Sequence, residues 1–451
     1  MINEAINENH CNILNNEKIE INCKANTDEK TWDDLFSLIN QTTKNTLTEN
    51  KITELEQVYL SIPEKDPLLK ALESIHDQLY LVEDIIPNCI KQFQEGDIVY
   101  SHHYFQMALE EINQVANLNY DFLVNIGLPS HHAFVGKASG FCIINKLAVL
   151  MAIEKSKQPN LHFAIIGLDV NQDDGLKDCL RNARNGVFKG SNLQHIDVHD
   201  PRVFPWPKKE IIKEEFKSAK TKHEEDNPRY FVDKYEYSIF DLSKNKRKQE
   251  GSIHPVIKKS LEQVEESIKK LADNEKIMIV VPLGWDSHQE ETACCGRRLN
   301  NGRFLSKDES IYERFSDTDM EYFYNALCDL KKTYASKVHK VLVSLEGGYN
   351  NELNKKQIKI LNESLEKNFN LDDQNKKNFK DNNTFFENLK SKPKPKTKLK
   401  ARTFSKKIRF KEKNRFFEDI KTNPNSVPSS LPDPKDTPRK NKTYSKKKSR
   451  F

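Results

Sequence analysis

No run of apolar residues in this 451-residue sequence is long enough to cross a membrane. The longest run, from Ile277 to Trp285, has the length of a buried strand, whereas a spanning helix needs roughly 20 apolar residues. Residues 1–10 also lack the basic start and apolar stretch of a secretory signal peptide. We therefore expect no transmembrane segment and no conventional secretion.

The eight cysteines contain no CxxC pair, and the adjacent Cys294 and Cys295 lack the spacing of a zinc knuckle. Scattered cysteines without the regular spacing of a disulfide framework favour reduced thiols in a cytosol-like compartment. We expect Cys142 and Cys179 to be core residues. Because 36% of the residues are hydrophobic, the chain can bury a sizeable core and is not wholly disordered.

The net charge of +5 hides a strong asymmetry along the chain. Residues 390–451 hold 22 Lys and Arg against 5 Asp and Glu, a net charge of +17. The remainder holds 50 basic and 62 acidic residues, a net charge of −12. Prolines and serines interrupt this basic segment, which indicates a disordered tail over 366–451. Two interpretations stay open, a solubilising tail and a contact with nucleic acid, an acidic membrane or the nuclear import machinery.

The middle of the chain alternates apolar strands with amphipathic helices. Such alternation predicts right-handed crossovers and a mostly parallel sheet covered by helices on both faces. We expect a polar N-terminal extension over 1–55 and one α/β domain over 56–365. The expected strands are 163–168, 194–198, 276–283 and 338–345, and the expected helices are 66–86, 254–273 and 320–337.

Polar residues stand where these predicted strands end. Asp169 follows one strand, His199 follows the next, and Asp286 and Tyr349 follow the two later strands. In open parallel sheets, binding sites gather at the carboxyl ends of the strands. The pattern therefore predicts one composite site at that edge of the sheet.

The strand-end residues belong to an ordered series of short motifs. The series contains the pair His131-His132, Gly140-Phe141-Cys142, the segment that begins Asp169-Val170-Asn171, Gly284-Trp285-Asp286-Ser287-His288, and Glu346-Gly347-Gly348-Tyr349-Asn350. From about Asp97 to about Leu361, this order and spacing resembles the zinc-dependent histone deacetylase family, which includes acetylpolyamine amidohydrolases. The resemblance implies the three-layer α/β fold shared by arginases and deacetylases.

The resemblance also implies roles for individual residues. Asp169 and Asp286 would be carboxylate ligands of Zn²⁺, which acts as a Lewis acid and activates water. His131 and His132 would move protons, Asp174 would orient one of these two histidines, and Tyr349 would donate a hydrogen bond to the developing oxyanion. Gly140, Phe141 and Phe204 would line the tunnel that holds the lysine stem.

The sequence departs from the family pattern at two positions of this site. Asn171 stands where the family has the histidine ligand, so the donor set becomes all oxygen and weaker for zinc. Gly167 stands where the family has a carboxylate that serves the other histidine of the pair. We therefore expect one histidine without its carboxylate, and either Asn171 or His288 completing the metal shell, around Zn²⁺ or another divalent metal.

Two functions follow from these motifs. The first is a metal-dependent hydrolase that removes an acyl group from lysine side chains of histones or other proteins, or from a polyamine. The second is a catalytically impaired protein that binds acyl-lysine and is tethered to chromatin or another acidic partner by the basic tail. An arginase-type two-metal site needs more Asp and His ligands than these strand ends offer. The composition favours a cytoplasmic or nuclear location, and it also suits a bacterial protein exported into host cells.

Overall fold

A computed structural model describes most of the chain up to residue 369. The predicted basic tail lies outside the described residues from position 370 onward, as do residues 1–9 and 15–28 of the predicted N-terminal extension. The described residues are 10–14, 29–42, 46–78, 80–87, 94–95, 98–99, 103–206, 220–222, 228–292 and 298–369.

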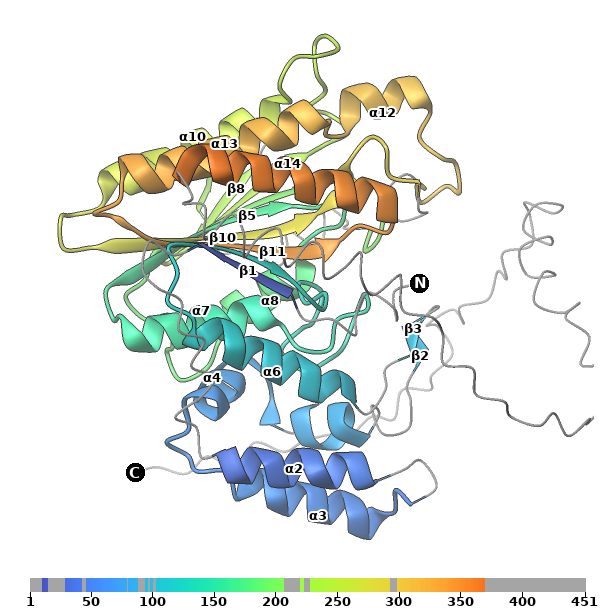
Figure 1. The fold of residues 1–451 in the computed structure, drawn as a ribbon, viewed down its shortest axis with the longest axis vertical. Coiled ribbons are helices and arrows are strands. Elements are labelled where there is room, and N and C mark those ends of the chain that lie inside the picture. Colours follow the sequence, from blue (N-terminus) through green and yellow to red (C-terminus); the bar gives the residue numbers. More distant parts are fainter. Residues whose placement is uncertain are drawn as a thin grey trace, which may run out of the picture. The chain divides into compact units, whose positions relative to one another are not determined.

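A twisted central sheet organises the fold (Figure 1), and nine strands belong to it within the described residues. The inner strands β4, β11, β10, β5, β6 and β9 run parallel. The outer strands β1, β8 and β7 pair antiparallel with their neighbours. In sheet order, the strands are β1 (His10–Leu14), β4 (Phe122–Ile126), β11 (Val338–Gly347), β10 (Lys276–Gly284), β5 (Leu161–Leu168), β6 (Leu193–His199), β9 (Tyr235–Asp241), β8 (Arg229–Val232) and β7 (Lys220–Lys222).

Helices cover both faces of this sheet, as the sequence predicts (Figure 1). On one face lie α10 (Pro255–Lys270), α13 (Asp317–Thr333) and α14 (Asn351–Phe369). On the other face lie α4 (Pro67–Ile75), α6 (His103–Asn117), α7 (Lys146–Lys157) and α8 (Asp174–Asn182), with α2 (Glu29–Gln41) and α3 (Glu49–Leu60) farther from the sheet. The remaining elements are η1 (Tyr80–Ile85), β2 (Gln94–Glu95), β3 (Ile98–Val99), η2 (Trp285–Ser287) and α12 (Lys307–Glu313).

Alternation along the inner strands builds the two cores. In β10, Ile277, Ile279 and Val281 pack toward α10, α13 and α14, whereas Met278 and Val280 pack toward α7 and α8. All five side chains are buried, which explains why the strand reads as an unbroken apolar run. The fold is therefore the predicted three-layer α/β arrangement with a mostly parallel sheet.

The helix predicted over 66–86 is interrupted in the structure. The first part, α4, ends at Ile75, because His76 has an extended backbone with φ −110° and ψ 151°. The buried His76 ring explains this break. Its Nδ1 lies 3.0 Å from the carbonyl oxygen of Phe134, and its Nε2 accepts a hydrogen bond from the backbone N–H of Asn145 at 3.0 Å. The extended conformation carries this ring from the helix to the loop that follows the histidine pair.

The N-terminal helices share the core of the body. Trp32, Leu35 and Ile39 of α2 are buried in the same hydrophobic cluster as α4 and α6. The Trp32 indole N–H also donates to Oδ2 of Asp66, the N-cap residue of α4, at 3.2 Å. A domain boundary at residue 55 stays a prediction, but the described helix α2 is part of the packed interior.

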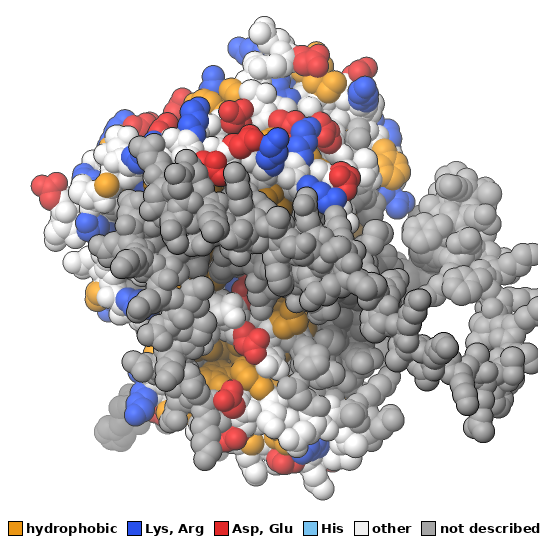
Figure 2. All heavy atoms as spheres, viewed as in Figure 1, with side chains coloured by type: hydrophobic (Ala, Val, Ile, Leu, Met, Phe, Trp, Pro, Cys, Tyr) orange, Lys and Arg blue, Asp and Glu red, His pale blue; other side chains and the backbone are white. Residues whose placement is uncertain are grey.

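The exposed helical face carries charges of both signs, as Figure 2 shows over α13 and α14. Lys355 pairs with Glu352, and Lys356 pairs with Glu290 and Asp317. Local pairing of this kind leaves no field of one sign on that part of the surface. None of the described helices is both long enough and apolar enough for a membrane span.

Candidate active site

Two carboxylates converge at the carboxyl edge of the sheet. Asp169 follows β5 and Asp286 lies in η2, directly after β10, and β5 and β10 are adjacent parallel strands. A Cβ atom placed on Gly284 would lie 1.8 Å from Oδ2 of Asp169 and 2.5 Å from Oδ1 of Asp286. A Cβ atom on Gly347, at the end of β11, would lie 2.6 Å from Oδ2 of Asp286 and 2.9 Å from Oδ2 of Asp169. Glycine at these two strand ends therefore leaves room for both carboxylates to share one gap.

These carboxylates are buried without enough hydrogen-bond donors. Oδ2 of Asp169 and both carboxylate oxygens of Asp286 have no partner with good hydrogen-bond geometry among the described residues, although the backbone N–H of Val170 lies close enough to Asp286 to lower its pKa. Burial and the nearby Asp286 raise the pKa of Asp169 well above its usual range. Burial and the nearby Glu291 raise the pKa of Asp286 to about 6. Two adjacent buried carboxylates with orphaned oxygens fit a bound divalent cation, which would offset their charge.

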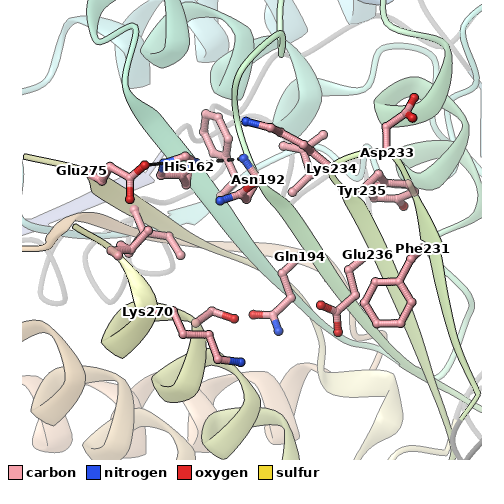
Figure 3. Close-up of a pocket in the computed structure, with 15 residues that line it drawn as sticks. His162, Asn192, Gln194, Phe231, Asp233, Lys234, Tyr235, Glu236, Lys270 and Glu275 are labelled. Atoms are coloured by element: carbon pink, nitrogen blue, oxygen red, sulfur yellow. Dashed lines mark hydrogen bonds and ion pairs between the residues drawn. The ribbon is translucent and has the colours of Figure 1, made fainter. Parts of the chain in front are cut away.

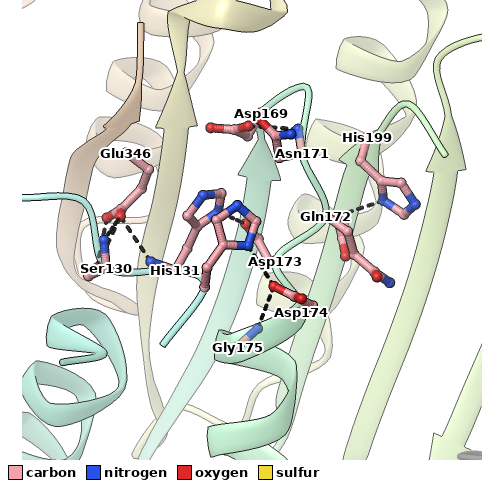
Figure 4. A network of polar contacts seen from close by, with 12 residues as sticks. Ser130, His131, Asp169, Asn171, Gln172, Asp173, Asp174, Gly175, His199 and Glu346 are labelled. Carbon is pink, nitrogen blue, oxygen red and sulfur yellow. Dashed lines mark hydrogen bonds and ion pairs between the residues drawn. The ribbon is translucent and has the colours of Figure 1, made fainter. Parts of the chain in front are cut away.

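Asn171 lies beside this pair but offers only an amide oxygen. Its backbone N–H donates to Oδ1 of Asp169 at 2.7 Å (Figure 4). Its side-chain N–H donates to the carbonyl oxygen of Phe204, also at 2.7 Å. Within the described residues, no three His, Cys, Asp or Glu side chains are placed to share a metal ion. The donors present therefore fit a cation bound through oxygen better than they fit the mixed nitrogen and oxygen set that zinc prefers.

His288 is directed away from the carboxylate pair. Its Nδ1 accepts from the backbone N–H of Glu290 at 3.1 Å, and its Nε2 lies 3.4 Å from a carboxylate oxygen of Asp317. Among the described residues His288 is not placed to share a metal ion with the two carboxylates, so the expectation that it completes a metal shell is wrong.

The two adjacent histidines each face a carboxylate. Nδ1 of His131 lies 2.7 Å from Oδ1 of Asp173, and Nδ1 of His132 lies 2.6 Å from Oδ1 of Asp174. The two rings lie close together, with centroids 3.9 Å apart, and both residues are buried. Bonding at Nδ1 leaves Nε2 of each ring for chemistry with a substrate.

Charge separates the proton affinities of these histidines. Burial lowers the pKa of His131, but Asp169, the hydrogen bond to Asp173, and Glu346 together raise it to about 10. Burial and the neighbouring His131 lower the pKa of His132. The two rings therefore favour different protonation states, with His131 charged and His132 neutral.

The expectation that Gly167 deprives one histidine of its carboxylate is wrong. Asp173 supplies that carboxylate from a different position in the chain, and it is fully buried against His131 (Figure 4). A Cβ atom on Gly167 would lie 2.0 Å from Oδ2 of Asp173. Glycine on the strand therefore leaves the space into which the Asp173 carboxylate extends.

Glu346 fixes the backbone of the histidine pair. Its Oε2 accepts from the backbone N–H groups of Ser130 and His131, the latter at 3.1 Å, and its Oε1 accepts from the Ser344 hydroxyl at 2.8 Å. Glu346 lies near the end of β11, so this side chain ties the loop bearing the histidines to the strand that leads to Tyr349.

Two of the predicted tunnel residues, Gly140 and Phe204, lie next to His132. The ring of Phe204 meets the His132 ring edge to face at a centroid distance of 5.1 Å. A Cβ atom on Gly140, which has φ +52°, would lie 2.5 Å from Cδ2 of His132. Phe141 follows it, is only partly buried, and accepts a hydrogen bond at its backbone carbonyl from the Tyr104 hydroxyl at 3.0 Å. The assignment of Phe141 and Phe204 to a lysine tunnel stays a prediction.

Tyr349 lies in the loop after β11, two residues beyond Gly347, the glycine that borders both carboxylates. The buried Glu291 holds this loop, because its Oε2 accepts from the backbone N–H groups of Tyr349 at 2.9 Å and Asn350 at 3.1 Å. Sequence reasoning missed Glu291, as well as Asp173 and His195, since nothing in their local pattern marks a partner far along the chain.

A second hollow lies at the opposite edge of the sheet, among the amino ends of the strands (Figure 3). It has a volume of about 300 Å³ and is lined by residues that include His162, Gln194, Tyr235 and Glu275. None of the predicted site residues lines it. The carboxyl edge therefore remains the candidate active site.

The chain belongs to the histone deacetylase domain family, whose family model matches residues 41–365. Among curated proteins, it is 24% identical over 134 residues to "Histone deacetylase 6" of Caenorhabditis elegans. The match covers 30% of this chain and 12% of that relative, so it spans about an eighth of the relative's length.

Two solved structures are similar to this chain at low identity. The structure titled "Crystal Structure of HDA15 HD domain" has a TM-score of 0.44 and 14% identity, covering 66% of this chain and 74% of that one. Acetylpolyamine aminohydrolase from Burkholderia pseudomallei has a TM-score of 0.38 and 12% identity, covering 75% of this chain and 81% of that one.

Proposed function

We propose that the protein is a metal-dependent hydrolase that cleaves the amide bond of an acylated lysine side chain or polyamine. The observation that carries this proposal is the convergence of two orphaned carboxylates, Asp169 and Asp286, beside two histidines that each face a carboxylate. Membership of the histone deacetylase family supports the same chemistry.

Asp169 and Asp286 would hold the metal ion, with the amide oxygen of Asn171 as the further donor. When bound, a divalent ion supplies Lewis-acid activation of the acyl carbonyl and of water. We also propose which kind of metal ion binds: the oxygen donors favour a harder divalent ion than zinc.

The histidines would divide the proton transfers. Neutral His132 would accept the proton of the attacking water at Nε2, while Asp174 holds the ring through Nδ1. Charged His131 would stabilise the developing oxyanion and give the departing amine its proton. The water oxygen bonds to the acyl carbon, the carbon–nitrogen bond breaks, and a carboxylate and a free amine leave.

A hydrolysis assay on the full chain tests this proposal. Acetate release is measured from an acetyl-lysine peptide and from an N-acetylated polyamine, with Zn²⁺, Co²⁺, Mn²⁺ or Fe²⁺ added separately. We expect metal-dependent turnover, and Tyr349→Phe should lower kcat roughly 100- to 1,000-fold if its hydroxyl stabilises the oxyanion. Tyr312→Phe is the matched control, because Tyr312 is 37% exposed on α12, away from the site. Absence of turnover with every metal and substrate would reject the hydrolase.

Asn171 favours one alternative, a protein that binds acyl-lysine without cleaving it. Its side-chain N–H is committed to Phe204, and an amide oxygen is a weak zinc ligand. Elemental analysis of the purified protein separates the two functions. Stoichiometric metal supports the hydrolase, whereas peptide binding by metal-free protein supports the alternative.

A further inference from the structure

The Asp173 carboxylate lies between two imidazoles. Its Oδ1 is 2.7 Å from Nδ1 of His131, and its Oδ2 is 3.1 Å from Nε2 of His195, on β6. An ionised carboxylate can only accept hydrogen bonds, so both of these nitrogens carry a proton. With its proton on Nε2, a neutral His195 accepts at Nδ1 from the Tyr235 hydroxyl, 3.0 Å away. The Tyr235 hydroxyl on β9 therefore donates to His195 on β6, and His195 in turn donates to Asp173.

Asp173 needs this support because of its place in the chain. It is the N-cap residue of α8, where a carboxylate normally accepts from the first amides of its own helix. Here the side chain makes no capping hydrogen bond and is directed inward instead. Two competing orientations are thus available to this side chain, and the N–H of His195 stabilises the one that reaches His131.

Because Asp173 is buried, the inward orientation of its side chain would be energetically unfavourable without the N–H of His195. Asp173 and His195 are both 0% exposed, so no solvent replaces a lost hydrogen bond at Oδ2. Gly167 completes the arrangement, since a side chain there would occupy the position of the same oxygen atom.

We infer that His195, held by Tyr235, is a positioning residue that acts through Asp173 to fix the orientation of the His131 ring. This inference rests on the proposed hydrolase for its kinetic consequence, whereas the arrangement of His131 itself can be measured without turnover.

Steady-state kinetics test the consequence. His195→Leu removes the N–H, and we expect kcat to fall roughly 10- to 100-fold with little change in KM, as is typical when the support of a site histidine is lost. His195→Gln keeps an amide N–H at a similar reach and should retain most of kcat. Tyr235→Phe should give a smaller loss than His195→Leu. Tyr237→Phe is the matched control, because it removes a buried hydroxyl two residues along β9 that bonds Asp197 and Gln172 but not His195.

Proton NMR of the imidazole N–H groups tests the arrangement. A buried ring N–H bonded to a carboxylate gives a strongly deshielded resonance, which His131→Gln assigns to His131. We expect this resonance to broaden or move in His195→Leu and Asp173→Asn, and to persist in Tyr237→Phe. This measurement stands even if no substrate is hydrolysed, so failure of the inference and failure of the proposed function give different results.

Moving the carboxylate back to the strand gives the sharpest test. Gly167→Asp alone forces two carboxylates into one volume and should abolish activity. The double variant Gly167→Asp/Asp173→Gly holds the carboxylate on β5, and we expect it to recover activity. In that background His195→Leu should no longer lower kcat. An equal loss in both backgrounds, or an unchanged His131 resonance in His195→Leu, overturns the inference.

Discussion

Gly167 and Asp173 share one volume: a Cβ atom on the glycine would lie 2.0 Å from Oδ2 of the aspartate, far inside van der Waals contact. The backbone of β5 and the buried Asp173 side chain therefore meet directly. The carboxylate bonds two histidines in that position, so the contact is part of the site and not only of the packing.

Gly167→Ala is expected to destabilise the fold and displace Asp173. The added methyl group overlaps a buried, hydrogen-bonded oxygen, and overpacking of this kind costs about 1–3 kcal/mol. Urea denaturation followed by circular dichroism measures the change in the free energy of unfolding. The same substitution made together with Asp173→Ala removes the overlap, so Gly167→Ala should then cost much less. A similar cost in both backgrounds would contradict the shared volume.

Asn171→His should raise affinity for zinc by about tenfold or more, which corresponds to about 1.4 kcal/mol. The reason is that an imidazole nitrogen would join the carboxylates of Asp169 and Asp286, giving the donor set that zinc prefers. Competition with a chromophoric chelator measures the affinity. Gln172→His is the matched control, because the Gln172 side chain instead donates to the Tyr237 hydroxyl at 2.9 Å. Unchanged affinity in Asn171→His would remove position 171 from the ligand set.

Glu154 should make stability sensitive to acid. Burial raises the pKa of this carboxyl, but His339, Lys340 and Lys157 outweigh burial and lower the pKa from its usual 4.5 to about 2. A folded-state pKa below the unfolded value stabilises the fold above about pH 4.5, and this contribution is lost as the pH falls toward 2.

Glu154→Gln is therefore expected to lower the free energy of unfolding at pH 7 by on the order of 3 kcal/mol. The difference from the native chain should shrink as the pH falls from about 4.5 toward 2, which chemical denaturation at several pH values measures. Glu262→Gln, at an exposed position of α10, is the control and should leave the pH dependence unchanged. A difference that stays constant with pH would contradict the linkage.

Trp32→Ala should unfold the chain at lower denaturant concentration. The side chain is 4% exposed and packs in the main core, so its removal should cost about 3–5 kcal/mol. Phe304→Ala, at a position 55% exposed, should change stability by less than about 0.5 kcal/mol. If Trp32→Ala were equally mild, the N-terminal helices would not belong to the cooperative fold.

Four of the six inner parallel strands, β5, β6, β10 and β11, could be predicted because each is buried on both faces. The sequence did not predict the parallel strands β4 and β9. An uninterrupted run such as Lys276–Gly284 has few structural alternatives once helices flank it. The break after α4 could not be predicted, since apolar spacing continues through His76. That break depends on the bonds of His76 to Phe134 and Asn145, which are distant in sequence.

Some residues of the candidate site could likewise be predicted from the sequence, and others could not. Asp169 and Asp286 could be placed together because adjacent parallel strands end side by side. The carboxylate partner of His131 could not be found, because Asp173 resembles an ordinary helix cap in sequence and its inward orientation depends on space left by Gly167. His195 lies within a buried strand, where a polar residue gives no sign of what it faces.

The side chain of Glu291 joins two stretches of the chain that are otherwise separate. Its carboxylate holds the backbone of Tyr349 and Asn350 and raises the pKa of Asp286. A change at this one position would therefore alter both the proton affinity of the Asp286 carboxylate and the position of the loop that carries Tyr349.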